Sequence, residues 1–482
     1  MPFCLILLTN KYNIMVRLKQ LFLSALLLPT LAQAKLPYIS GSNNAGVALC
    51  KDGNVYSWGS DTTALGNTGI LNLDKTAPDF VEQSFYSKPQ LVATGDVKFK
   101  KVVAGSGAMF YGVTESGELY RWGVPNEETI PFSQVMKDGK PLVDVKAVAS
   151  DTNGFTALMN DGHAVYSYWT TNEHKEKIEV IKDVVLESGE LLENIVEVSA
   201  SDFGFYYVTA DGSAYGNGTW NGNNSTSYME LTDYVLPVLD ADKNPLKNVK
   251  FVEGGNVMAF ALMQDGSLYS WGNGGWCQCT GQGVSKTTKN AERVVAGEYS
   301  TISGNVYLTN VMQVSAGRAF TLCVTTDGHA LYWGCNEGNG GSAPFEGERA
   351  GYTPVLLKYA DGTVVEDAVA VSTGDNFGFL INKKGEVYSF GLNNSGQCGV
   401  GSDKEEVKSL VKMDLPCELP EYVNVSFNAD KLRLCDGDAI SSFISATSNS
   451  GYRIMWTHDG TILDETGDVC PYYGDGDRKS VV

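Results

Sequence analysis

The sequence is poor in the side chains that most often carry catalysis. Only four of its 482 residues are histidines, and no Ser-His-Asp set or nucleophile elbow stands at a characteristic spacing. Basic side chains are also scarce, because 36 Lys and Arg face 56 Asp and Glu for a net charge of −20. An acidic surface repels the phosphate backbone of nucleic acids. These shortages argue against a nucleic-acid partner and favour a non-enzymatic role.

Metal sites and membrane spans also lack support. Cys277 and Cys279 lack the two-residue gap that is usual in zinc knuckles. Residues 240–244 begin like a calcium loop, but Pro245 stands where such a loop needs glycine, so a turn is the better interpretation. No later stretch approaches the roughly 20 apolar residues that a spanning helix needs. We therefore expect no metal, no cofactor and no membrane span.

The N-terminal residues have the pattern of an export signal. Arg17 and Lys19 precede an apolar run over residues 21–31, and an Ala-Gln-Ala cleavage site follows. This predicts Met15 as the true start, residues 1–34 as the leader and Lys35 as the first mature residue. Removing the leader leaves 33 basic against 56 acidic side chains, a net charge of −23. The expected location is secreted, periplasmic or on the cell surface. Nine cysteines would remain, and an odd number in an exported protein implies a free thiol or an intermolecular bond.

What the sequence has in plenty is a repeated hairpin pattern. In its clearest copy, FALMQDGSLYSWGN, two apolar alternations flank Asp265 and Gly266. Because glycine tolerates the positive φ of a tight turn, the pattern predicts a β-hairpin. Such hairpins bury their apolar faces only by stacking on one another. Seven copies occur, and their turn glycines are Gly53, Gly117, Gly162, Gly212, Gly266, Gly328 and Gly385.

A fainter pattern lies between the hairpins. KDGKPLVDVKAV (137–148), ESGELLENIVEV (187–198), ADKNPLKNVKFV (241–252) and ADGTVVEDAVAV (360–371) share a turn, an apolar pair and alternating valines. We interpret it as a second hairpin in each unit. Seven four-stranded units predict an all-β fold, a closed seven-bladed β-propeller over residues 35–428.

The first hairpin copy has no outer hairpin ahead of it. Residues 407–413 and 422–426 could supply one from the other end of the chain. The prediction is a first blade that both ends of the chain share and that latches the ring.

One segment carries a resemblance to a known family. FGLNNSGQCGVG (390–401) resembles the signature of the regulator-of-chromosome-condensation repeat, a seven-bladed propeller family. That signature runs Asp-Gly, an aromatic strand, Trp-Gly, Asn and Gly-Gln-Leu-Gly; here Cys398 replaces the leucine, and WGNGGWCQCTGQG (271–283) is a looser version. The resemblance covers residues 35–428 and implies the fold. It implies little about function, because propellers host many unrelated roles.

After residue 428 the hairpin signature ends while the alternation continues. Cys435, Trp456 and Cys470 resemble the Cys-Trp-Cys skeleton of a small Ig-like surface module, at a spacing too short for an antibody-type domain. Residues 429–476 are interpreted as an Ig-like fragment with a Cys435–Cys470 disulfide, or as a degenerate strand pair packed on the propeller. Residues 477–482 have the sequence of an adapter-encoded, non-native tail, which predicts that the natural chain continues.

Aromatic residues fall into two groups. One group recurs at an equivalent place in each blade and is expected to pack blade against blade: Trp58, Trp122, Trp271, Trp333 and Phe390. The other group breaks the repeat and lies in loops, where large aromatics on a rigid scaffold are typical of binding hot spots. Its members are the candidate binding residues: Trp220, Trp276, Tyr299 and Phe345.

The sequence thus favours an exported, monomeric, non-enzymatic scaffold whose propeller-rim loops bind a protein partner. Two alternatives stay open. A carbohydrate-active enzyme or polysaccharide-binding propeller would need paired carboxylates in the central channel. An adhesin fragment of a larger surface protein would be followed by further Ig-like domains.

Overall fold

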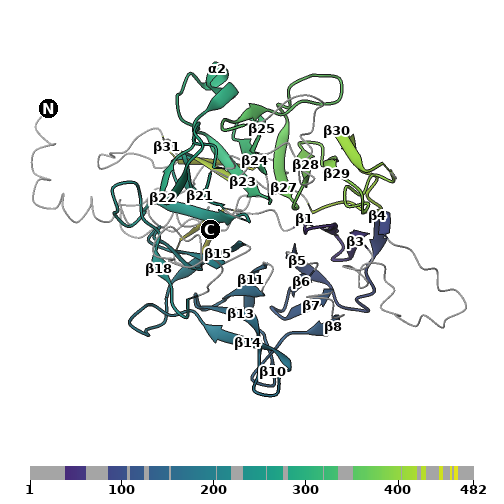
Figure 1. The fold of residues 1–482 in the computed structure, drawn as a ribbon, viewed down its shortest axis with the longest axis vertical. Coiled ribbons are helices and arrows are strands. Elements are labelled where there is room, and N and C mark those ends of the chain that lie inside the picture. Colours follow the sequence, from purple (N-terminus) through teal and green to yellow (C-terminus); the bar gives the residue numbers. More distant parts are fainter. Residues whose placement is uncertain are drawn as a thin grey trace, which may run out of the picture. The chain divides into compact units, whose positions relative to one another are not determined.

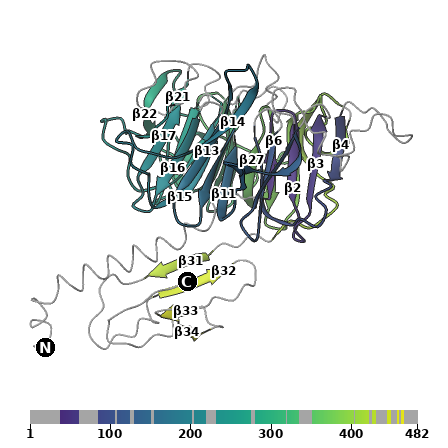
Figure 2. The same ribbon diagram turned by 90° about the horizontal axis from the view of Figure 1, so that it is seen from below.

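A computed structural model gives the structure of the chain. It describes residues 38–60, 85–105, 109–123, 130–150, 154–201, 204–218, 232–256, 258–274, 280–318, 320–334, 351–402 and 404–420, and the backbone of four short strands beyond them. Its contacts divide the chain into two compact units, one of which is Ala34–Pro420. The described part of this unit is a ring of β-sheets (Figure 1), and the strands run along the ring axis (Figure 2).

Seven four-stranded antiparallel sheets form the ring, each with its strands in sequence order. This confirms the predicted seven-bladed propeller. The first three blades are β1 (Ile39–Gly41), β2 (Ala45–Leu49), β3 (Val55–Ser60) and β4 (Phe85–Leu91); β5 (Phe99–Ala104), β6 (Met109–Thr114), β7 (Leu119–Gly123) and β8 (Ile130–Gln134); and β11 (Val145–Ser150), β12 (Phe155–Met159), β13 (Ala164–Thr171) and β14 (Lys177–Asp183).

The next two blades are β15 (Ile195–Ser201), β16 (Gly204–Thr209), β17 (Ala214–Gly218) and β18 (Leu236–Pro237); and β19 (Val249–Gly254), β20 (Met258–Met263), β21 (Leu268–Asn273) and β22 (Thr287–Arg293). The last two are β23 (Val311–Ala316), β24 (Phe320–Thr325), β25 (Ala330–Gly334) and β26 (Val355–Leu356); and β27 (Ala368–Thr373), β28 (Phe377–Asn382), β29 (Val387–Leu392) and β30 (Glu406–Lys412). The first strand of each blade lies nearest the ring axis (Figure 1).

The Asp-Gly pairs form the turn between the second and third strands of a blade. Gly266 has a φ of +80°, and the turn glycines of all seven copies have positive φ values. The aspartate closes the turn, because Asp265 Oδ1 accepts a hydrogen bond from Ser267 N at 2.9 Å. Hydrogen bonds from the Ser267 hydroxyl and backbone lower the pKa of Asp265. The seven predicted hairpins are therefore confirmed, with the geometry that glycine allows.

The same turns join neighbouring blades. The carbonyl of Gly117 accepts a hydrogen bond at 2.8 Å from the amide of Val145, the first residue of β11. Corresponding bonds link Gly53 to Phe99, Gly162 to Ile195, Gly212 to Val249, Gly266 to Val311, and Gly328 to Ala368. Each of these six turns thus fixes the start of the innermost strand of the following blade.

A substitution at such a joint separates backbone strain from steric clash. Gly328 has a φ of +94°, and a Cβ there would lie 2.4 Å from the carbonyl oxygen of Glu366. Gly385 has a φ of +74° with no atom within 4 Å of its Cβ position. We expect Gly328→Ala to cost about 2–4 kcal/mol of unfolding free energy and Gly385→Ala only about 1 kcal/mol. Urea unfolding of both variants measures the difference. Equal losses of unfolding free energy would contradict the role of Gly328 in joining the two blades.

The fainter pattern does not form a second hairpin within a blade, so that assignment is wrong. In its first copy, β9 (Met136–Lys137) and β10 (Lys140–Pro141) form a two-residue ladder, after which the chain enters β11 of the next blade. The pattern therefore marks the passage between blades. The fourth strand of a blade instead follows the Trp-Gly strand, as β8 follows β7.

The predicted latch is also wrong. Blade 1 is completed by β4, β30 pairs with β29 in blade 7, and β31 (Val425–Ala429) pairs with β32 (Ile444–Ser448). Beyond them, β33 (Trp456–His458) pairs with β34 (Thr461–Asp464). The predicted Cys435–Cys470 disulfide lies outside the described residues.

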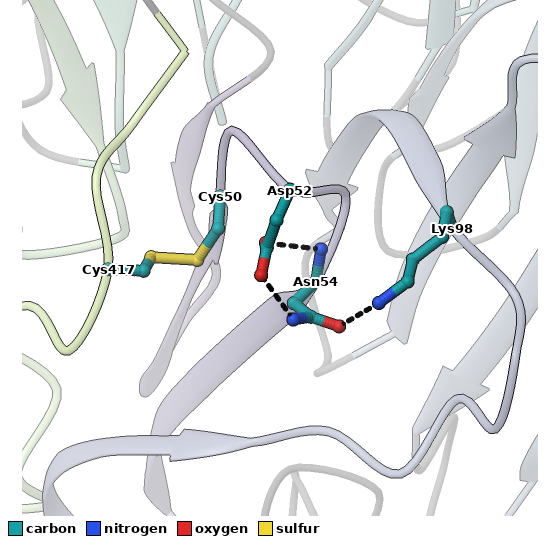
Figure 3. Close-up of a disulfide and its surroundings, with 5 residues drawn as sticks. All are labelled: Cys50, Asp52, Asn54, Lys98 and Cys417. Carbon is teal, nitrogen blue, oxygen red and sulfur yellow. Dashed lines mark hydrogen bonds between the residues drawn. A yellow bond between two sulfur atoms is a disulfide. The ribbon is translucent and has the colours of Figure 1, made fainter.

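The ring closes through residues that follow β30. Lys51 N, in the first hairpin turn, donates a hydrogen bond to Glu418 O at 2.8 Å. In blade 3 the matching donor, Asn160 N, bonds to Asp144 O directly before its own innermost strand. The returning chain therefore takes the place of the missing linker into blade 1. A Cys50–Cys417 disulfide, with Cα atoms 5.9 Å apart, fixes it there (Figure 3).

The family signature has a packing role at the same joint. Trp58 of blade 1 donates its indole N–H to Gln397 O of blade 7 at 2.8 Å. A Cβ at Gly399 would lie 2.7 Å from that indole nitrogen. The Gly-Gln-Cys-Gly segment thus covers the tryptophan of the next blade, and only glycine leaves room for it. Trp58, Trp122, Trp271, Trp333 and Phe390 are all 0 % exposed, as a packing role requires.

Candidate functional site

Three of the four predicted binding residues, Trp220, Trp276 and Phe345, lie outside the described residues. The fourth, Tyr299, is only 1 % exposed. It belongs to an insert between blades 5 and 6, consisting of η5 (Gly297–Tyr299) and α2 (Ser300–Ser303). The insert stands at the outer edge of the ring (Figure 1). Tyr299 therefore positions a surface loop rather than forming its exposed face.

Blade 6 holds the insert firmly. The Tyr299 hydroxyl donates a hydrogen bond to Asp327 Oδ2 at 2.9 Å, and its ring centroid lies 5.7 Å from that of His329. Glu298 N donates to Pro354 O at 2.9 Å, and Leu356 N donates to Glu298 Oε2 at 3.0 Å. Contacts from both ends of Glu298 and from a buried ring leave the insert little freedom to move.

The Tyr299–Asp327 contact fixes the charge state of both groups. Burial, together with the carboxylate of Asp327, raises the pKa of Tyr299. Burial alone would raise the pKa of Asp327, but hydrogen bonds from Thr325, His329 and Tyr299 outweigh it and lower that pKa to about 2. At neutral pH the pair is a phenol donating to a carboxylate, which is a charge-assisted and therefore strong hydrogen bond.

Around this support lies an exposed apolar surface. Val306 is 75 % exposed, Val284 48 %, Ile302 46 % and Tyr307 42 %. Ala296 N donates to Val306 O, and Val295 pairs with Tyr307 across a β-bridge. The remaining exposed large apolar residues of the described chain are spread over other blades: Leu91, Met136, Val143, Ile178, Leu191 and Val411. We call Val284, Ile302, Val306 and Tyr307 the insert patch.

A cation lies on the aromatic member of the patch. The Arg293 guanidinium carbon is 4.7 Å from the centroid of the Tyr307 ring. A guanidinium stacked on a ring holds that ring in one orientation. Tyrosine and arginine are also the residues in which binding hot spots are enriched. The candidates from the sequence were only aromatic residues in loops and therefore did not include Ile302 and Val306. The sequence does carry a signal for them, because Ile302 and Val306-Tyr307 flank a Gly-Asn pair that is typical of an exposed turn.

A pocket opens on the ring axis. All seven blades line it, chiefly with small residues at the ends of their innermost strands, such as Ser42, Ser150 and Thr373. Its charged lining residues are Arg318 and Asp375. Nowhere in the described ranges do three or more His, Cys, Asp or Glu side chains form a group that could hold a metal ion. The helices within those ranges are all too short or too polar to cross a membrane.

The ring of seven four-stranded sheets defines a closed β-propeller, and the Gly-Gln-Cys-Gly segment serves its joint between blades 7 and 1. Two family models described as the regulator of chromosome condensation (RCC1) repeat match residues 368–397 and 384–427. These matches, together with the propeller fold, confirm the resemblance to this repeat family over residues 368–427.

Relatives are distant. Protein pim1 of Schizosaccharomyces pombe is 26 % identical over 330 residues, which cover 62 % of this chain and 58 % of pim1. The chain thus spans less than two thirds of that relative's length. The crystal structure of human WBSCR16 matches with a TM-score of 0.61 and 16 % identity over 77 % of this chain and 96 % of that one. Prp20p from Saccharomyces cerevisiae, solved with a description of its binding properties to Gsp1p and histones, matches with a TM-score of 0.54 and 16 % identity over 79 % and 88 %.

Proposed function

We propose that this propeller is an exported, non-enzymatic recognition protein that binds a protein partner through the insert patch. The observation that carries the proposal is that Ile302, Val306 and Tyr307 are exposed within six residues of chain, directly after the anchored Glu298 and Tyr299. Val284 is exposed in the loop that follows Gly281, whose carbonyl accepts a hydrogen bond from the bridge partner of Tyr307, Val295. Exposed apolar side chains scattered singly are normal, whereas a gathered set on a rigid support marks an interaction surface.

Charge indicates the kind of partner. The chain carries a net charge of −20, so its field favours proteins with a basic surface. We therefore expect a partner with an apolar centre, which covers the insert patch, and a positively charged rim. Prp20p, with its described binding to Gsp1p and histones, shows that a propeller of this fold can serve protein recognition.

Two observations support export. The leader pattern ends at an Ala-Gln-Ala site before Lys35. Cys50 and Cys417 form a disulfide across 367 residues of chain. Disulfides form and persist in oxidising compartments and are rare in reducing ones.

The test compares two substitutions of the same kind at different places. Val306 is 75 % exposed within the patch, and Val143 is 43 % exposed between blades 2 and 3. Both aspartate variants should fold normally, because exposed substitutions change stability by about 0.5 kcal/mol or less. We expect a basic protein from the producing organism to be recovered stoichiometrically with the wild type and with Val143→Asp. Val306→Asp should weaken its binding by about tenfold or more, as hot-spot losses do.

Further arms decide between outcomes. Trp276→Ala tests whether the loop aromatic that the sequence singles out belongs to the same surface. Binding that weakens with added salt supports a basic partner. Equal recovery of the partner with Val306→Asp and Val143→Asp would contradict binding through the insert patch. If the purified wild type self-associates and Val306→Asp abolishes this, the partner at the insert patch is a second copy of the chain.

A further inference from the structure

The innermost strands carry a second feature that the recognition surface does not use. Three lysines and one glutamate lie near the starts of four consecutive innermost strands: Lys101 on β5, Lys146 on β11, Glu197 on β15 and Lys250 on β19. In each of these strands the pairing with the second strand of the blade shifts register near the first residue, and the charged residue lies at or directly after that shift. All four residues therefore lie at about the same height along the ring axis. The axial pocket is lined by the other ends of these strands, three or four residues further on, which is roughly 10–13 Å away.

The four side chains lie close enough to one another to interact electrostatically. Glu197 interacts electrostatically with Lys101, Lys146 and Lys250, which come from blades 2, 3 and 5. A group on blade 4 reaches blade 2, beyond its immediate neighbour, only on the side where the innermost strands approach one another. The site is therefore the axial channel, at the end opposite the pocket.

Positive charge in this cluster exceeds negative charge. Within the described chain, Lys146, Lys250 and Glu197 make no hydrogen bond and no ion pair within 4.0 Å. All three side chains are partly buried. Desolvated charges without a close partner are costly, so such a group favours a counter-ion. The cluster is also exceptional in a chain with 20 more acidic than basic side chains.

We propose that Lys101, Lys146 and Lys250 form a binding site for a small oxyanion, a phosphate or a carboxylate, in the axial channel. Lysine ammonium groups are compact donors that suit tetrahedral and planar oxyanions alike. Glu197 is the internal competitor of the ligand, because its carboxylate already occupies the field of the three cations. This site is separate from the insert patch, so neither proposal depends on the other.

Glu197 also makes the site sensitive to pH. Burial raises the pKa of Glu197 to about 7, against the opposing effect of the three lysines. Burial lowers the pKa of Lys250, and Glu197 partly restores it. The other charged residues of the innermost strands are Lys100 and Glu253, while β1, β23 and β27 carry none. Protonation of Glu197 removes the competing charge, so oxyanion affinity rises as the pH falls through about 7.

Calorimetric titration of the full chain with inorganic phosphate and, separately, with citrate tests the site at about pH 6 and about pH 8. We expect binding in the wild type that is tighter at the lower pH. The double variant Lys146→Met/Lys250→Met should bind about tenfold or more weakly, since each charge-assisted contact is worth about 1.5–3 kcal/mol and 1.4 kcal/mol is tenfold. Lys289→Met, which removes an exposed lysine of β22, is the matched control and should bind like the wild type.

Glu197→Gln gives the test a second direction. Because it removes the competing carboxylate, we expect tighter binding at pH 8 and a loss of most of the pH dependence. A gain in affinity cannot arise from misfolding. Preference for phosphate or for citrate identifies the class of ligand. Absence of binding of both anions to the wild type, or equal affinity of the double variant and Lys289→Met, would overturn the proposal.

Discussion

Replacing Cys50 and Cys417 together by serine is expected to lower the free energy of unfolding by about 3–5 kcal/mol. The disulfide closes a loop of 367 residues, which is almost the whole propeller. A cross-link of that span restricts the unfolded chain more than a short one does. It also holds the segment at Glu418 that replaces the linker into blade 1. Urea unfolding under oxidising conditions, followed by tryptophan fluorescence, measures the loss.

Two controls separate the covalent bond from other effects of the substitution. Adding a thiol reductant should destabilise the wild type to about the level of the double variant and leave the variant unchanged. Cys323→Ala removes a free, buried thiol of blade 6 and should cost clearly less. Equal unfolding midpoints for the oxidised wild type and the double variant would show that the ring closes without the disulfide.

Trp333→Ala is expected to cost about 3–5 kcal/mol, as large-to-small changes of buried aromatics do. Trp333 is 0 % exposed and packs edge-on to Phe260 of blade 5 at a centroid distance of 5.7 Å. The loop of blade 5 covers it, because a Cβ at Gly281 would lie 2.8 Å from the indole nitrogen. The cavity would thus open between two blades, where neither sheet can collapse to fill it.

The chain offers matched controls for this prediction too. Blade 7 has Phe390 in the equivalent place, so Trp333→Phe should lose much less than Trp333→Ala. Trp169 of β13 is only partly buried, and its ring centroid lies 5.8 Å from the guanidinium carbon of Arg121. Trp169→Ala should therefore lower the unfolding free energy by only about 1 kcal/mol. Guanidinium unfolding ranks the three variants. A loss for Trp333→Ala no larger than that for Trp169→Ala would contradict the packing role.

The fold could be predicted from the sequence because its determinants are local. Each Asp-Gly turn needs a positive φ, and each hairpin alternates within a few residues, so the seven copies were visible without any long-range information. The second pattern gave a wrong strand assignment because each of its copies spans the connection between two blades. In ESGELLENIVEV the turn belongs to one connection, while Ile195 and Glu197 already belong to the innermost strand of blade 4.

The details that depend on distant contacts could not be predicted. No local pattern links Cys50 to Cys417, and the latch was wrong because the returning chain supplies a linker in place of a strand. Tyr299 looked exposed because its partner Asp327 lies in the next blade. The lysine cluster did leave a signal. Lys101, Lys146, Glu197 and Lys250 occur in four consecutive repeats, and aligning the innermost strands places them at two adjacent positions.

Photo-crosslinking tests most directly whether the insert patch is the recognition surface. A photoreactive amino acid at Val306, introduced in the full chain in the producing organism, should give one dominant crosslinked protein with a basic surface. The same residue at Val143 should give none, and Tyr307→Ala combined with the Val306 probe should greatly reduce the crosslink. A crosslink of equal strength from both positions, or from Val143 alone, would contradict recognition through the insert patch.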